Sequence, residues 1–270
     1  MSGLVIHFAS MMCLLVILTG PSSALFWRPS LPTYPSDPND SYYQVFKTVP
    51  APEVTAKKLM TNFLGYSHIT KRQTVIEDIV IVMDGSGSIG SCEFKKGKEA
   101  LKHMIKTLHN PTHDSKYAAV TFSSTATVNF KFLPHSSAAS EITTISYPGG
   151  GTNTQEALAE AKKLFDDPSS GRRQFPSRSL VFLVTDGQSN HKDSTIRSAN
   201  ALKRSGVEIY VVAVGHHIHG IDEIVQVASH PPDNFLFRVK DLQGFWNIVK
   251  LTVNVVFPDK YDIVNYDPPC

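Results

Sequence analysis

Apolar residues recur along this chain in two different rhythms. From residue 75 onward, short and continuously apolar runs alternate with longer stretches in which apolar residues lie three and four positions apart. Short continuous runs are typical of strands buried on both faces, and the wider spacing is typical of amphipathic helices. The expected strands cover residues 79–83, 117–122, 127–133, 180–184, 208–214 and 235–239.

The stretches between the strands have the helical pattern. In the first, Phe94, Leu101 and Ile105 form an apolar face and a stripe of lysines lies on the other side. The expected helices cover residues 94–108, 155–165, 194–204, 221–228 and 241–256, the last one capped by Asp241. This alternation predicts an α/β fold with a doubly wound, mostly parallel, Rossmann-like sheet and helices on both faces. A short turn joins the second and third strands, so we expect one antiparallel edge strand.

The first residues resemble a targeting segment. Residues 4–18 are nearly all apolar, and Ser22, Ser23 and Ala24 supply the small side chains of a signal-peptidase site. We therefore interpret residues 1–24 as a secretory signal peptide, which indicates a secreted protein. Because no Lys or Arg precedes the apolar run, an uncleaved anchor is the alternative.

Residues 25–74 are rich in proline. We expect an extended Pro-rich linker there, with a short helix from Glu53 to Leu64. Asn39 begins an N-x-S sequon and is a glycosylation candidate. The rest of the chain divides into a domain at 75–258 and a C-terminal tail at 259–270 that ends in cysteine.

The net charge limits the classes of partner, and the cysteines limit which disulfides can form. The 26 basic and 24 acidic side chains leave a formal net charge of +2, which gives no field that would favour nucleic acid. Cys13 leaves with the signal peptide, so Cys92 and Cys270 remain in an oxidising compartment. An intrachain disulfide, a link to a second molecule that makes a homo-oligomer, and a free thiol are all open alternatives.

The string from Gly85 to Gly90 matches the G-x-G-x-x-G pattern of dinucleotide sites. However, Asp84 ends the preceding strand and puts a negative charge where a pyrophosphate would lie. The second strand is followed by hydroxyl residues instead of the acid that binds ribose. We therefore expect no nucleotide.

The side-chain oxygens of the same turn indicate a different ligand. Asp84, Ser86 and Ser88 alternate after a buried strand, residues 148–154 form a glycine-rich loop with hydroxyls, and Asp186 ends a second buried strand. Oxygen ligands of this kind suit Mg²⁺, Mn²⁺ or Ca²⁺. If the two strands flank the point where strand order reverses, the three loops converge on one metal ion.

With Thr152 in the glycine-rich loop, these motifs resemble the metal-ion-dependent adhesion site of the von Willebrand factor type A domain. The resemblance covers residues 75 to about 257 and points to matrix members such as matrilins and type VI collagens. It implies that Ser86, Ser88 and Thr152 coordinate the ion directly, while Asp84 and Asp186 act partly through water. It also implies adhesion to extracellular matrix or cell-surface proteins, in which an acidic residue of the partner completes the ion's coordination.

Other residues are expected around this site. Gly151, Asn153, Gln188, His216 and His217 are predicted to form the rim that a ligand would meet. His219 lies close to the last two, so a Zn²⁺ site is conceivable, but a polar loop is the preferred interpretation.

Each oxygen also has an ordinary structural explanation as a helix cap or a turn, and only their joint occurrence favours the ion. A second hypothesis is a structural matrix component that uses the lysine stripe and intermolecular bonds through Cys270. The chain contains no nucleophile elbow and no H-E-x-x-H motif, so we do not expect an enzyme.

Overall fold

The computed structural model describes residues 31–65, 75–108, 113–173, 177–256 and 270. Residues Leu31–Cys270 belong to one compact unit. The expected signal peptide, residues 1–24, lies outside the described residues. Within the described ranges, no helix has the length and apolar character needed to cross a membrane.

A six-stranded sheet forms the centre of this unit, in the order β3-β2-β1-β4-β5-β6. β2 and β3 pair antiparallel, and the other neighbours pair parallel. The expected doubly wound, mostly parallel sheet with one antiparallel edge strand is therefore confirmed. The strands are β1 (Val75–Asp84), β2 (His113–Phe122), β3 (Ala126–Pro134), β4 (Arg178–Thr185), β5 (Glu208–Val214) and β6 (Leu236–Val239).

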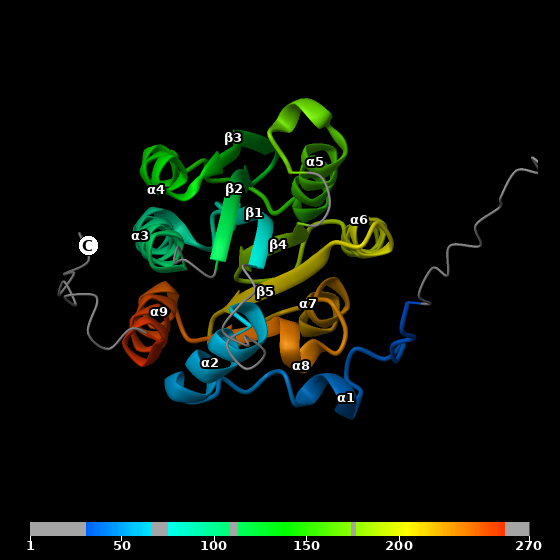
Figure 1. Ribbon diagram of the computed structural model, residues 1–270. Coiled ribbons are helices and arrows are strands. Elements are labelled where there is room, and N and C mark those ends of the chain that lie inside the picture. The colour runs from blue at the N-terminus through cyan, green and yellow to red at the C-terminus, as the bar shows by residue number, and fades with distance from the viewer. Residues whose placement is uncertain (1–30, 66–74, 109–112, 174–176, 257–269) are drawn as a thin grey trace, which may run out of the picture. The chain divides into compact units, whose positions relative to one another are not determined.

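Helices cover both faces of the sheet (Figure 1). One face packs against α3 (Gly90–Leu108), α4 (His135–Thr144) and α9 (Leu242–Val256), together with α2 (Pro52–Lys58) and the π-helical turn η1 (Leu59–Phe63). The other face packs against α5 (Thr154–Asp166), α6 (Lys192–Arg204) and α7 (Ile221–Val227), together with α1 (Ser41–Gln44). The short helices η2 (Pro168–Ser170) and α8 (Pro232–Phe235) complete the set described.

The central strands are apolar throughout because both of their faces are buried. In β1, Ile79, Ile81 and Met83 belong to the core on the α3 and α9 side, whereas Val80 and Val82 belong to the core on the α5 side. All five are at most 3% exposed. Side chains that alternate along a strand point to opposite faces, so a continuous apolar run supplies two cores at once.

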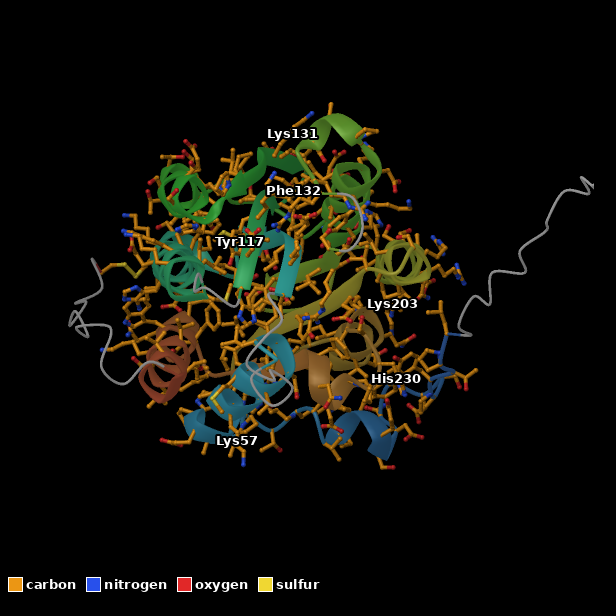
Figure 2. All side chains as sticks on the ribbon, in the orientation of Figure 1. Lys57, Tyr117, Lys131, Phe132, Lys203 and His230 are labelled. Carbon is orange, nitrogen blue, oxygen red and sulfur yellow. A yellow bond between two sulfur atoms is a disulfide. The ribbon has the colours of Figure 1, made fainter. Side chains whose placement is uncertain are left out.

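The edge strand β3 follows the alternating pattern instead. Phe132 is buried and packs against Phe165 of α5. The neighbouring Lys131 lies at the outside of the sheet, where its ammonium group pairs with Asp167 at 3.0 Å (Figure 2). A lysine on an exposed edge strand discourages pairing with other chains.

The N-terminal arm differs from the extended linker that the prolines predict. Residues 41–44 and 52–63 are helical and pack against the domain, with Tyr43 at 0% and Phe63 at 2% exposure. The short helix expected at 53–64 is present as α2 and η1. Pro52 begins that helix at a position where proline is tolerated. The prolines gave no indication of α1 or of the burial of Tyr43.

Helix α4 was not expected from the sequence. Its apolar face consists of Ala138, Ala139 and Ile142, and the two alanines contribute little to a hydrophobic pattern. The Lys98 ammonium group donates to the carbonyl oxygens of Thr143 and Ile145 at 2.8 and 2.6 Å, which satisfies acceptors at the end of this helix.

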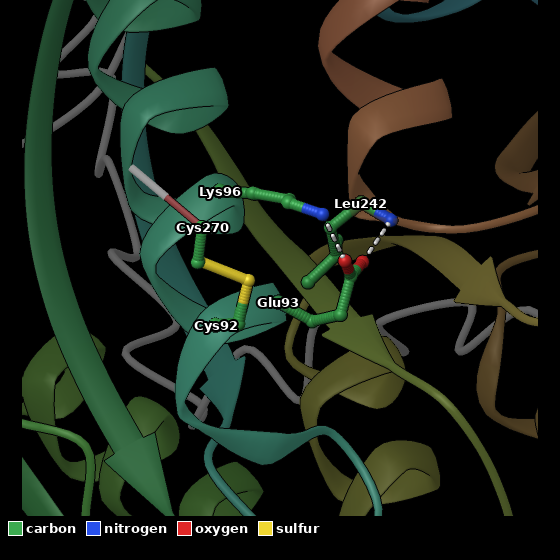
Figure 3. Close-up of a disulfide and its surroundings, with 5 residues drawn as sticks. All are labelled: Cys92, Glu93, Lys96, Leu242 and Cys270. Carbon is green, nitrogen blue, oxygen red and sulfur yellow. Dashed lines mark hydrogen bonds and ion pairs between the residues drawn. A yellow bond between two sulfur atoms is a disulfide. The ribbon is translucent and has the colours of Figure 1, made fainter. Parts of the chain in front are cut away.

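The end of the chain is bonded to the first turn of α3. Cys92 and Cys270 form an intrachain disulfide, so one of the three alternatives is realised in this structure (Figure 3). Beside it, Glu93 accepts the Leu242 N–H at the start of α9 at 2.8 Å and pairs with Lys96 at 2.7 Å. The expected cap by Asp241 is also present, because its Oδ1 accepts the Gly244 N–H at 2.6 Å.

Candidate metal centre

The predicted ion site lies where the order of strands reverses. From β1 the chain continues to β2 on one side, and from β4 it continues to β5 on the other, with β1 and β4 paired in parallel. Asp84 ends β1, and Asp186 follows the last residue of β4. Loops that leave the carboxyl ends of two such strands form the crevice in which doubly wound sheets bind ligands.

The first loop brings three of the predicted oxygens together. Asp84 Oδ1 accepts the backbone N–H of Ser86 at 2.9 Å. The hydroxyl oxygens of Ser86 and Ser88 lie 3.0 Å apart. The alternating spacing of the motif therefore produces a cluster of one carboxylate and two hydroxyls within a single turn.

The second loop joins the same cluster from β4. The Ser88 hydroxyl donates to Asp186 Oδ1 at 3.1 Å. The Thr185 hydroxyl donates to the other oxygen of Asp84, Oδ2, at 2.7 Å. Both carboxylates of the predicted site are thus tied to the opposite strand or loop.

The third loop, residues 148–154, is held against the first by its backbone. Gly87 N–H donates to the Gly150 carbonyl at 2.8 Å, and Tyr147 donates its hydroxyl to the Ser86 carbonyl at 3.0 Å. The carbonyl of Thr152 accepts the Asn190 N–H at 2.8 Å. Thr152 is therefore bonded to the Asp186 loop through its main chain.

Two glycines make this close approach of loops feasible. A Cβ on Gly85 would lie 2.5 Å from Pro148 Cδ, which is too close for any real contact. Gly150 has φ +110°, a region that side chains rarely adopt, and a Cβ there would lie 2.7 Å from Ser124 Oγ. Gly85 of the dinucleotide-like string and Gly150 of the third loop thus serve loop packing.

Burial makes the carboxylates of the cluster costly to ionise. Asp84 is 3% exposed, and this burial raises its pKa to about 6 despite hydrogen bonds from Thr185 and Ser86. Burial also raises the pKa of Asp186, while the Ser88 hydrogen bond opposes the shift. The two carboxylates additionally repel each other. A cation beside them would remove this penalty.

The donor set fits a hard divalent cation. The hydrogen bonds bring together two carboxylates, of Asp84 and Asp186, and two hydroxyls, of Ser86 and Ser88, which are oxygen ligands of the kind that Mg²⁺, Mn²⁺ and Ca²⁺ prefer. Thr152 is joined to these loops through its main chain. Asp84 and Ser86 are buried, whereas Ser88 is exposed. The cluster is therefore buried on the side of Asp84 and Ser86 and open to solvent on the side of Ser88. Among the described residues, no group of three or more His, Cys, Asp or Glu is placed to hold a metal.

The predicted rim residues are placed less uniformly. Gly151 and Asn153 flank Thr152 and bond to the turn between β2 and β3. Gln188 packs against Gly220 at the start of α7. His216 and His217 are exposed between β5 and α7. Within the described ranges, no hydrogen bond joins either histidine to the five ion-site residues.

Several residues that support the site were not predicted. Thr185, Tyr147, Ser124 and Asn190 bond to its loops, and Glu223 accepts the Ser189 N–H at 3.3 Å with each carboxylate oxygen. Glu223 is 2% exposed, and burial raises its pKa to about 7. Only Thr185 had a usable signal, because a polar residue ending an apolar strand next to Asp186 is unusual.

The fold and the motif agree with a family comparison. Residues 78–251 match the von Willebrand factor type A domain. This match covers more than half of the chain, so the protein belongs to the von Willebrand factor type A domain family. The family indicated by the sequence motif is therefore confirmed.

Curated relatives of the chain include the groups that the motif indicated. Mouse matrilin-1 is 32% identical over 180 residues, which cover 64% of this chain and 35% of matrilin-1. Human cochlin is 28% identical over 185 residues, covering 67% of this chain and 32% of cochlin. The collagen alpha-1(XII) chain of Notophthalmus viridescens is 28% identical over 195 residues, covering 71% and 20%. The chain thus spans a third or less of the length of several relatives.

Solved structures show the same fold. Proximal thread matrix protein 1 from the mussel byssus, in a structure with a zinc-occupied MIDAS motif, superimposes with a TM-score of 0.58 at 20% identity. The match covers 68% of this chain and 48% of that one. At this identity the likeness establishes the fold and leaves the ligand to the residues of this chain.

Proposed function

We propose that this protein is a secreted binding module of the extracellular matrix, which engages protein partners through a divalent cation held at the end of β1. The observation that supports this most is the junction of Asp84, Ser86, Ser88 and Asp186 by hydrogen bonds at the strand-order reversal. Thr152, from the third loop, completes the proposed ligand set. The proposed cation is Mg²⁺, with Mn²⁺ or Ca²⁺ as alternatives.

The charges of the ligand set favour adhesion. Ser86, Ser88 and Thr152 are neutral hydroxyls and are proposed to contact the ion directly, while Asp84 and Asp186 act partly through water. When bound, the ion supplies a positive centre that accepts one more hard anion. Because Ser88 is exposed, the open side faces solvent, where a Glu or Asp of a partner protein can reach it.

Each neighbouring group has a part in this binding. The Asp84 carboxylate accepts the backbone N–H of Ser86 and so holds the main chain there. The Thr185 hydroxyl donates to the same carboxylate and holds it in place. Asp186 orients the Ser88 hydroxyl. Asn153, Gly151, Gln188, His216 and His217 are proposed as the rim that selects the partner.

A capture experiment tests the proposal. The full chain, immobilised, is incubated with an extracellular-matrix extract in Mg²⁺, then in EDTA, and the captured proteins are compared. We expect capture that is lost in EDTA and in Asp84→Asn but retained in Asp193→Asn, an exposed acid of α6 that serves as control. Esterifying the carboxylates of the captured protein should abolish its rebinding. Capture that is equal with and without EDTA would contradict the proposal.

The second hypothesis, a structural component with a polyanion-binding lysine stripe, receives less support. The stripe consists of Lys95, Lys98, Lys102 and Lys106 on one side of α3. Lys102 pairs with Glu99 at 3.0 Å. The Lys98 ammonium group donates hydrogen bonds to the carbonyl oxygens of Thr143 and Ile145. Two of the four lysines, Lys98 and Lys102, are thus engaged within the protein, whereas Lys95 and Lys106 are exposed. The disulfide partner of Cys270 is Cys92 of the same chain, so that cysteine is not free to link molecules.

A further inference from the structure

The turn between β2 and β3 lies outside the three loops of the proposed ion site. Its residues Ser123 and Ser124 follow directly on Phe122, the last residue of β2. Ser123 is buried at 5% exposure and Ser124 is exposed. The turn nevertheless makes several of the contacts that hold the Thr152 loop.

Both neighbours of Thr152 bond to this turn. The Gly151 N–H donates to Ser124 Oγ at 2.9 Å. The Asn153 N–H donates to the Ser123 carbonyl at 2.8 Å, and the Asn153 side-chain amide donates to the Ser124 carbonyl at 2.7 Å. Thr152 is thus held between two residues that are anchored to the same pair of serines.

The opposite side of the same loop is anchored by Asn190. Its backbone N–H donates to the Thr152 carbonyl at 2.8 Å, and its side-chain amide donates to Asn153 Oδ1 at 3.3 Å. Ser124 Oγ also packs closely against Gly150 of the same loop, since a Cβ on Gly150 would lie 2.7 Å from it. The main chain at Thr152 is therefore restrained from both sides.

From this arrangement we infer that Ser124 is a positioning residue for the ion-dependent binding proposed above, and that it acts by fixing the main chain that presents the Thr152 hydroxyl. A neutral hydroxyl is a weak ligand, so its contribution depends on being held in place before the ion arrives. The Ser124 hydroxyl is the one side-chain acceptor for the Gly151 N–H among the described residues. Removing it frees the residue before Thr152 while the backbone bonds of Asn153 remain.

This inference rests on the proposed function, and three readouts on the full chain test it. In Ser124→Ala we expect about tenfold weaker Mg²⁺ affinity by calorimetry, as is typical when an outer partner of a ligand is lost. Hydrogen exchange of the Gly151 amide in the metal-free protein should be faster. The urea midpoint should stay at the wild-type value, because Ser124 is exposed.

Two matched variants complete the experiment. Thr125→Ala removes a neighbouring exposed hydroxyl of the same turn and should leave affinity and exchange unchanged. Ser124→Thr keeps the hydroxyl acceptor and should restore Mg²⁺ affinity towards the wild-type value. Wild-type affinity in Ser124→Ala, or a loss of affinity matched by a lower urea midpoint, overturns the positioning role alone. A wild-type protein that takes up no Mg²⁺ overturns the proposed function and the positioning role together.

Discussion

The hydroxyl of Ser88 donates a hydrogen bond to Asp186 Oδ1 at 3.1 Å, although 98 positions of sequence separate the two residues. The bond crosses from the loop after β1 to the loop after β4, which are neighbouring parallel strands. The register of that pairing therefore determines whether the oxygens of the two motifs meet. Stability of the sheet and assembly of the site depend on the same strand pair.

Gly85→Ala tests how closely the first and third loops must approach. A Cβ at this position would lie 2.5 Å from Cδ and 2.6 Å from Cγ of Pro148, a ring that cannot rotate away. We expect a loss of about 1–3 kcal/mol in the free energy of unfolding, as is usual for overpacking, together with weaker Mg²⁺ binding. Urea unfolding and calorimetry measure the two effects. Gly187→Ala is the matched control, because a Cβ there has nothing within 4 Å.

Arg238→Ala tests whether the N-terminal arm is part of the domain. Arg238 is 4% exposed and donates to the carbonyls of Phe46 and Lys47 in the arm and of Ala213 and Gly215 near the end of β5. Burial lowers its pKa to about 10. Its removal leaves buried carbonyls without donors, so we expect a loss of about 3 kcal/mol in the free energy of unfolding.

Limited proteolysis provides the second readout for this variant. Cleavage between residues 44 and 52 should become faster in Arg238→Ala. Arg197→Ala, which removes an exposed arginine of α6, should change the free energy of unfolding by no more than about 0.5 kcal/mol. Equal proteolysis of the wild type and Arg238→Ala would show that the arm is held by other contacts.

Glu223→Gln tests the buried acid beneath the Asp186 loop. Its carboxylate faces the Ser189 N–H, Lys192 and Asp222, and burial raises its pKa from 4.5 to about 7. In the folded state the group keeps its proton between these pH values, whereas the unfolded chain releases it. The free energy of unfolding of the wild type should therefore fall as pH rises through that window.

The glutamine variant lacks this titration. The difference in free energy of unfolding, variant minus wild type, should rise by about 2–3 kcal/mol between pH 4 and pH 8. Urea titrations across this range, run with EDTA, measure it. Parallel pH profiles for the two proteins would show that Glu223 does not titrate as its burial implies.

The disulfide between Cys92 and Cys270 closes a segment of 178 positions. Replacing both cysteines by serine should lower the free energy of unfolding by about 2–4 kcal/mol, because the unfolded chain gains freedom. The wild-type protein should run as a monomer on a non-reducing gel. A disulfide-linked multimer of the wild type would contradict the intrachain bond.

The sequence predicted the sheet well because its strands are buried on both faces. Continuous apolar runs such as residues 79–83 and 180–184 are typical of strands that are buried on both faces. Their alternation with helices then predicts a mostly parallel sheet. The edge pair was predictable for a similar reason, since a short turn joins β2 to β3. Helix α4 was missed because its buried positions are mainly alanine, which contributes little to a hydrophobic pattern.

The grouping of Asp84, Ser86 and Ser88 in one turn was also predictable, whereas most of the residues that bond to their loops were not. Asp84, Ser86 and Ser88 are close in sequence, and their spacing alone indicates a shared target. Ser124 and Asn190 act through backbone atoms of distant loops, and such contacts leave no spacing pattern. The arm was misjudged because burial of Tyr43 and Phe63 depends on a surface formed by the whole domain.

The most direct test of the central claim is a calorimetric titration of Mg²⁺ into the purified, folded full chain, repeated with Asp84→Asn. We expect the wild type to bind about one ion per chain. The variant should bind none while retaining the wild-type circular dichroism spectrum. Failure of the folded wild type to take up Mg²⁺, Mn²⁺ or Ca²⁺ at millimolar concentration would contradict the assignment of the site.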